Sequence, residues 1–203
     1  YPQRFAAKLR DLLDLVLLAA LWGVSFLFMR YAAPAFGPLP LIWLRVAVAA
    51  LCLVPVLIVR GQQPALRRHA ASIALMGVFS SALPFVLIAW AMLSITAGLA
   101  SILNATVPIF TALIGALWLR ERLGFWRATG LAVGFAGVLL LAADKADFRP
   151  GGSGWAIGAM LLATLSYGFA ANLTRRQLGG VPALVNAAGS QLASAIVLLP
   201  FAV

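Results

Sequence analysis

The sequence is poor in the residues that give soluble proteins their hydrated surface and enzymes their chemistry. Charged residues make up only 10% of its 203 residues, whereas about a quarter is usual in soluble domains, and 64% are hydrophobic. The single cysteine, Cys52, has no partner, which excludes a disulfide-stapled secreted domain. The single histidine, His69, belongs to no Cys/His pattern with metal-ligand spacing, so we expect no metal and no cofactor. This composition indicates an all-α integral membrane protein with several spans.

Acidic residues are also scarce, with five Asp and Glu against 15 Lys and Arg and a net charge of +10. In a soluble protein this excess would suggest nucleic acid, but membrane proteins collect Lys and Arg in their cytoplasmic loops. We therefore expect a lipid bilayer around the chain and no nucleic-acid partner. No predicted span interior contains Asp, Glu or His, so the visible spans carry no proton-loading group and predict uniport or exchange.

Hydrophobic runs long enough to cross a bilayer occur seven times. A run of 50 residues from Ala70 to Leu119 contains no charge, and we divide it at the turn-forming stretch Ser94–Gly98. Pro84 predicts a kink in the first half of this run. The predicted spans are residues 14–33, 39–60, 70–93, 97–119, 126–143, 154–173 and 182–203.

The basic residues outside the spans predict the orientation. With the N-terminus in the cytoplasm, the outer loops contain only Lys145 and Arg149. Eleven others fall on the cytoplasmic side, as expected of bacterial inner-membrane proteins. They are Arg4, Lys8, Arg10, Arg60, Arg67, Arg68, Arg120, Arg122, Arg127, Arg175 and Arg176.

An internal similarity predicts an inverted repeat. Residues 17–21 (LLAAL) recur as residues 161–165 (LLATL), and Pro38 and Pro182 are separated by the same 144 residues. This offset contains five spans, so the second copy points the opposite way. We expect residues 1–143 to form a cytoplasmic segment and the first repeat, residues 144–153 an external linker, and residues 154–203 the start of a second repeat. The apolar last residues predict three further spans, on the order of 90 residues, in a longer protein.

A set of small, aromatic and charged residues occurs in a distinctive order along the chain. It consists of Ala97–Ser101, Pro108 and the aromatic residue after it, Glu121–Leu123, Gly130, Gly134 and Gly137, with Trp22, Gly23, Phe26 and Arg45 earlier in the chain. With these features the sequence resembles the EamA-type domain of the drug/metabolite transporter superfamily, above all over residues 97–141. The resemblance implies ten transmembrane helices in two inverted five-helix repeats, export or exchange of small metabolites, and a cavity lined by the first, third, fourth and sixth helices. Arg120 departs from the pattern, because the family commonly has glycine there.

Polar and aromatic side chains deep in these spans are the candidate substrate-binding residues. Ser101, Asn104 and Pro108 share one predicted helical face, and Pro108 frees the carbonyl of Asn104. Lipid cannot satisfy such groups, so this face should turn inward. Aromatic residues with a few polar groups are typical of small-molecule sites. The candidates are Trp22, Ser25, Phe85, Trp90, Ser101, Asn104 and Tyr167.

Each candidate has a structural alternative. Ser101 and Asn104 could join helices by hydrogen bonds, any one aromatic residue could simply pack, and Trp90 could sit in the outer aromatic belt. Arg30 could extend its charge to the outer headgroups, and Arg45 could bind a substrate carboxylate or carbonyls at a neighbouring helix end. Gly130, Gly134 and Gly137 form a small-residue face that predicts close packing, including a homodimer.

The favoured function is secondary transport of small metabolites, with amino acids, including aromatic ones, as favoured substrates. The alternatives are a multidrug or other metabolite exporter of the same fold, a lipid-group transferase, and a non-transport membrane subunit. A transferase would need acids or histidines near an interface, and a four-helix multidrug pump would need a glutamate in its first span. The five acids are poorly placed for a transferase, and the first span contains no glutamate, so we expect no enzyme.

Overall fold

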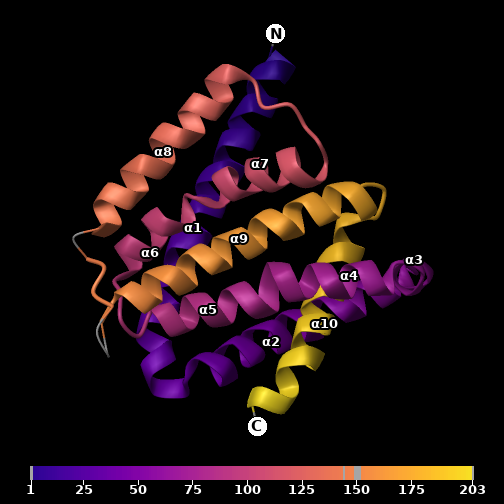
Figure 1. Cartoon of the computed structure of the whole chain (residues 1–203). Helices are drawn as coiled ribbons and strands as arrows, with labels where there is room; N and C mark the ends of the chain where they lie inside the picture. Colours follow the sequence, from indigo (N-terminus) through magenta and orange to yellow (C-terminus); the bar gives the residue numbers. More distant parts are fainter. Residues whose placement is uncertain (1, 144, 149–151, 203) are drawn as a thin grey trace.

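In the computed structural model, residues 2–143, 145–148 and 152–202 are described, with side chains from residue 11 onwards. Every regular element in these ranges is helical (Figure 1). The elements are α1 (Pro2–Phe36), α2 (Pro38–Val59), α3 (Gln63–Arg68), α4 (Ala70–Gly77), the π-helical turn η1 (Val78–Ala82), α5 (Leu83–Ala91), α6 (Ala97–Asn104), α7 (Val107–Trp118), α8 (Phe125–Ala143), α9 (Gly154–Gln177) and α10 (Ala183–Ala202).

Seven helical segments of the described residues are long and apolar enough to cross a membrane, which confirms the predicted number of spans. Two of them consist of more than one helical element: α4, η1 and α5 form the third, and α6 and α7 form the fourth. A single residue, Gly37, separates the first two spans, and its positive φ of 79° makes the tight reversal possible. The spans are Asp11–Phe36, Pro38–Val59, Ala70–Ala91, Ala97–Trp118, Phe125–Ala143, Gly154–Gln177 and Ala183–Ala202.

Proline accounts for both interruptions. Pro108 has no backbone N–H, so the carbonyl of Asn104 lacks its usual helical partner. The chain tightens there, with the N–H of Thr106 donating to Leu103 O at 3.1 Å, before α7 begins. In the third span, Pro84 follows directly on the wider π-helical turn of η1, which rearranges the backbone bonds just before it.

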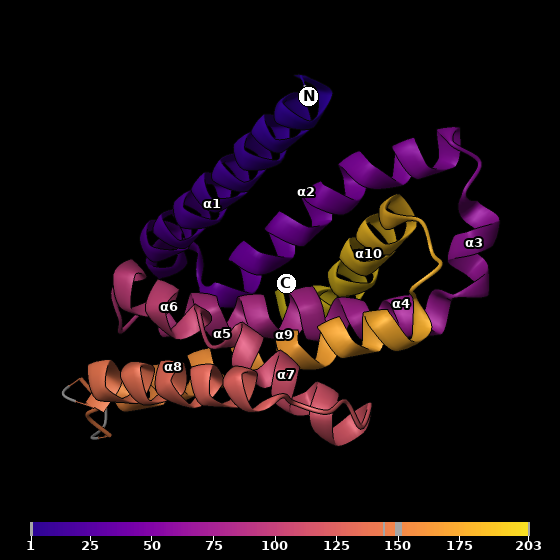
Figure 2. The same cartoon turned by 90° about the horizontal axis from the view of Figure 1, so that it is seen from above.

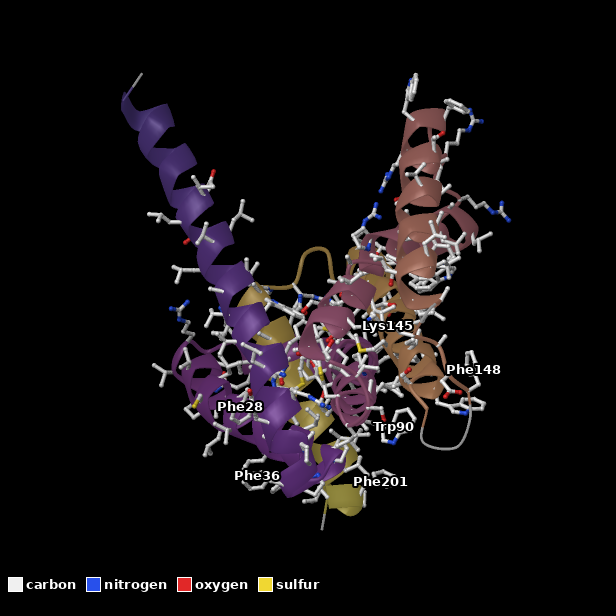
Figure 3. The ribbon with its side chains drawn as sticks, turned by 90° about the vertical axis from the view of Figure 1, so that its left-hand side faces the viewer. Phe28, Phe36, Trp90, Lys145, Phe148 and Phe201 are labelled. Carbon is white, nitrogen blue, oxygen red and sulfur yellow. The ribbon has the colours of Figure 1, made fainter. Side chains whose placement is uncertain are left out.

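Helix α9 lies at the centre and is the most buried of the seven spans. It packs between α5 and α7 (Figure 2), while α10 packs against α2 and α4. Figure 3 shows α1 and α8 as the two outer arms of the molecule. Residues 11–24 of α1 and most of α8 expose apolar side chains, as expected of surfaces that face lipid or a further helix.

Two glycines bring helices into backbone contact. A Cβ on Gly168 of α9 would lie 2.9 Å from the backbone of Phe110 and Thr111 in α7. A Cβ on Gly77 of α4 would lie 2.6 Å from the carbonyl oxygen of Ser190 in α10. Small residues at such crossings let membrane helices approach closely, because side-chain bulk no longer separates the backbones.

The Gly168→Ala substitution should therefore destabilise the protein, because the new methyl group meets backbone that cannot move aside. We expect a loss of about 1–3 kcal/mol, the usual range for overpacking. Gly158→Ala is the matched control on the same helix, since Gly158 has open space around it. Thermal unfolding in detergent should show a lower midpoint for Gly168→Ala only. Equal midpoints for the two variants would contradict this packing.

Candidate functional site

The described residues form an open cavity of about 480 Å³ at the meeting point of the central spans. The cavity is mostly apolar, and the residues that line it belong to α1, η1, α5, α6, α7 and α9. Trp22 and Tyr167 lie near the middle of their spans, which places the cavity at mid-membrane depth. The lining residues are Trp22, Ser80, Phe85, Asn104, Val107, Tyr167, Ala170, Ala171 and Thr174.

Three aromatic rings form one wall. Tyr167 of α9 meets Trp22 of α1 edge to face, with ring centroids 6.3 Å apart. It meets Phe85 of α5 in the same way, also at 6.3 Å. Such edge-to-face pairs hold rings in defined orientations, so the three helices present a continuous aromatic surface to a ligand.

Two polar atoms of the cavity wall lack partners. Asn104 Oδ1 and the Tyr167 hydroxyl are buried and make no hydrogen bond within the described residues. By contrast, the Thr174 hydroxyl donates to Ala170 O at 2.8 Å and is satisfied within its own helix. Buried polar atoms without partners cost free energy. A ligand that bonds to Asn104 or Tyr167 supplies the missing hydrogen bond and removes this cost.

The structure brings together four of the seven predicted site residues: Trp22, Phe85, Asn104 and Tyr167. Ser25 is half-buried on α1 but does not line the cavity. Trp90 is 45% exposed and lies at the end of the molecule that also carries Phe36 (Figure 3).

Ser101 is also off the cavity. It is exposed, and its hydroxyl donates to Ala97 O at 2.9 Å within α6. Ser101, Asn104 and Pro108 would share a face only on an unbroken helix. The interruption between Asn104 and Val107 divides that face: Asn104 lines the cavity, whereas Pro108 is exposed.

Several lining residues were not predicted. Ala170, Ala171 and Thr174 lie three, four and seven residues after Tyr167, so helical spacing from that tyrosine would have found them. Ser80 belongs to the π-helical turn, where ordinary helical spacing fails. Val107 lies at the start of α7, directly after the break.

The two arginines inside spans differ in their partners. The Arg30 guanidinium donates to the carbonyl of Met92 at the end of α5, so it caps a neighbouring helix and does not simply extend to headgroups. Arg45 stacks on the Phe85 ring, with its Cζ 4.1 Å from the ring centroid. Phe85 also lines the cavity, so Arg45 lies directly behind one of its walls.

Near the C-terminal end of α9, two arginines contact the end of α7. Arg175 pairs with Glu121, and the Arg176 guanidinium lies 5.2 Å from the Trp118 ring centroid. The Trp118 ring stacks in turn on Phe169, at 5.2 Å. The Glu121–Leu123 segment noted in the sequence thus ties the end of α7 to α9.

Arg120, next to this ion pair, adopts a left-handed conformation with φ of 55°. A helix commonly ends with glycine in this conformation, because a Cβ is disfavoured there. The departure from the family's glycine therefore places a strained residue at the end of α7.

Comparison with known proteins identifies the family. The sequence matches the EamA-like transporter family over residues 12–143, which is more than half of the chain. The chain belongs to the EamA-like transporter family. It is a multi-span membrane protein of a transporter family.

Curated relatives of this EamA-like chain are also transporters by name. It is 29% identical over 92% of its length to a probable terminal-alkyne amino-acid exporter of Streptantibioticus cattleyicolor, covering 62% of that protein. It is 28% identical over 63% of its length to an uncharacterized transporter of Archaeoglobus fulgidus, covering 46% of it. It is 26% identical over 73% of its length to the uncharacterized inner membrane transporter YedA of Escherichia coli K12, covering 48% of it. The chain thus spans about half to three-fifths of the length of these relatives.

Replacing Asn104 by leucine should impair transport without unfolding the protein. Leucine keeps the branching and the number of side-chain heavy atoms but removes the unpartnered oxygen that faces the cavity. We expect counterflow in proteoliposomes to fall about tenfold, the effect of losing one ligand hydrogen bond of roughly 1.4 kcal/mol. Ser101→Ala, on the same helix but off the cavity, should change counterflow less than about twofold. The opposite ranking of the two variants would remove Asn104 from the site.

Proposed function

We propose that this EamA-like chain is part of a secondary transporter that exports or exchanges small metabolites, with amino acids as favoured substrates. The cavity carries this proposal: it combines aromatic walls with two unpartnered polar atoms at mid-membrane depth. Interrupted helices beside a midplane site are typical of secondary transporters that work by alternating access. Two interrupted spans, at η1 and between α6 and α7, contribute to this cavity.

Amino acids fit the chemistry of the cavity. Trp22, Phe85 and Tyr167 offer an apolar and aromatic surface for a side chain, which favours aromatic amino acids. Asn104 Oδ1 can accept a hydrogen bond from an ammonium group. The relative from Streptantibioticus cattleyicolor, which is named as a probable amino-acid exporter, supports the same substrate class.

Counterflow across a substrate panel tests this function. Proteoliposomes containing the full chain are loaded with unlabelled L-phenylalanine, L-glutamate or ethidium, and uptake of the labelled compound is measured. We expect exchange of L-phenylalanine that an imposed pH gradient does not change, because the predicted spans contain no proton-loading side chain. Exchange of ethidium alone would support a multidrug exporter of the same fold instead. No exchange of any compound would support a non-transport membrane subunit.

The proposed orientation in the membrane follows from the same charge pattern. The loop around Arg67 and the pair of Arg175 with Glu121 lie on the cytoplasmic side, and residues 145–148 lie outside. The small-residue face of α8 is open: a Cβ added at Gly130, Gly134 or Gly137 would meet no other atom within 4 Å. That openness is compatible with a homodimer through α8, which we retain as a proposal.

Cysteine substitutions in a Cys52→Ala background test both placements. Asp147→Cys should react with an impermeant maleimide in intact cells, whereas Arg67→Cys, also at an exposed position, should react only after lysis. The reverse pattern would invert the orientation. Gly134→Cys should form disulfide-linked dimers in membranes under oxidation, and Val133→Cys, next to it and exposed, is the control. Equal cross-linking of these two variants would remove the glycine face as an interface.

A further inference from the structure

Arg45 is a cation inside a membrane span with little to neutralise it. Its guanidinium lies over the Phe85 ring, and one Nη donates weakly to the Met29 sulfur at 3.8 Å. Among the described residues no carboxylate or carbonyl group bonds to it. A guanidinium has five N–H donors, so most of those of Arg45 remain unused. At this depth an unneutralised charge is costly, and such residues are typically functional.

Two other described arginines show what Arg45 lacks. Arg30, in the neighbouring span, donates to the Met92 carbonyl. Arg175 pairs with a carboxylate, and it is more than half exposed to solvent. Arg45 has neither a strong acceptor nor full access to solvent, because its side chain is half-buried between α1, α2 and α5.

Phe85 connects Arg45 to the cavity. The ring contacts the guanidinium, meets Tyr167 edge to face, and itself lines the cavity. Arg45 itself does not line the cavity, so a ligand would have to reach it past the edge of the Phe85 ring. Stacking on a ring uses the flat face of a guanidinium and leaves its N–H edge for a planar acceptor.

We propose that Arg45 is the carboxylate-binding residue of this site and that the site takes a carboxylate compound with an apolar or aromatic body. The proposal rests on the transport function proposed above and names the chemical group by which the site recognises its substrate. Guanidinium and carboxylate groups match in a bidentate pair, which would satisfy the unused N–H edge and neutralise the charge together. The apolar body lies among Trp22, Phe85 and Tyr167, and a donor group of the substrate bonds to Asn104 Oδ1.

Three related compounds separate these contributions. L-Phenylalanine has both charged groups, 3-phenylpropionate keeps only the carboxylate, and 2-phenylethylamine keeps only the ammonium group. Each competes against labelled L-phenylalanine in counterflow with the full chain in proteoliposomes. The wild type should bind 3-phenylpropionate better than 2-phenylethylamine. Arg45→Gln should weaken competition by L-phenylalanine and 3-phenylpropionate at least about tenfold and leave 2-phenylethylamine unchanged.

Two further variants control for charge and folding. Arg30→Gln removes another arginine inside a span, one that bonds to a helix end, so it should keep the preference for carboxylates. Arg45→Lys keeps the positive charge but not the bidentate fork. It should keep the preference while weakening 3-phenylpropionate several-fold, and it provides the test if Arg45→Gln does not fold.

Binding is also measured without transport, as the rise in melting temperature that 3-phenylpropionate produces in detergent. Stabilisation of the wild type but not of Arg45→Gln supports the assignment. Equal stabilisation of the wild type and Arg45→Gln by 3-phenylpropionate overturns it. Identical affinity of the wild type and Arg45→Lys for this compound overturns it as well. Absence of exchange together with carboxylate-dependent stabilisation would instead contradict the transport function and leave Arg45 as the binding residue.

Discussion

The close contact of α9 with α7 positions the helix that contributes the most residues to the cavity wall. Thr164, Gly168 and Asn172 recur every four residues along α9 and form the ridge that meets α6 and α7. The hydroxyls of Thr164 and Thr106 are 2.9 Å apart, Gly168 lets the backbones touch, and Asn172 Nδ2 donates to Thr111 O at 2.9 Å. Because side chains are small or hydrogen-bonded along this ridge, the two helices are held at short range without a solvent-driven hydrophobic effect.

An adjacent face of the same helix forms the site. Tyr167, Ala171 and Thr174 project to the cavity while their neighbours Gly168 and Asn172 face α7. The third span is fixed in a similar way, since the Ser166 hydroxyl donates to Phe79 O at 2.7 Å. The packing of α9 thus sets the position of Tyr167, and Tyr167 in turn orients Trp22 and Phe85 through its two ring contacts.

Hydropathy and charge were sufficient to predict the seven spans, because the bilayer imposes length and composition on each of them. The site was harder to predict. Trp22, Phe85, Asn104 and Tyr167 follow from the expectation that deep polar and aromatic groups face inward. Ser101 did not follow, although it lies on the same uninterrupted helix as Asn104. Residues three apart on a helix point about 60° away from each other, so Asn104 can face the cavity while Ser101 is exposed.

Two features depend on tertiary contacts that sequence spacing does not encode. Asn172 is a polar residue in the sixth span, yet its amide bonds to α7 and it does not line the cavity. Arg30 and Arg45 have similar settings in the sequence, yet one caps a helix end and the other stacks behind the cavity. These differences arise from which helices become neighbours, and local periodicity carries no information on that choice.

The claim that a substrate occupies the space between α1, α5, α6 and α9 can be measured directly at Ala171. Ala171→Cys, in a Cys52→Ala background, places a thiol on the cavity wall without adding much bulk. We expect a small methanethiosulfonate reagent to modify this cysteine and block counterflow, and saturating L-phenylalanine to slow the modification about tenfold. Modification at the same rate with and without L-phenylalanine, or modification that leaves counterflow intact, would contradict the account.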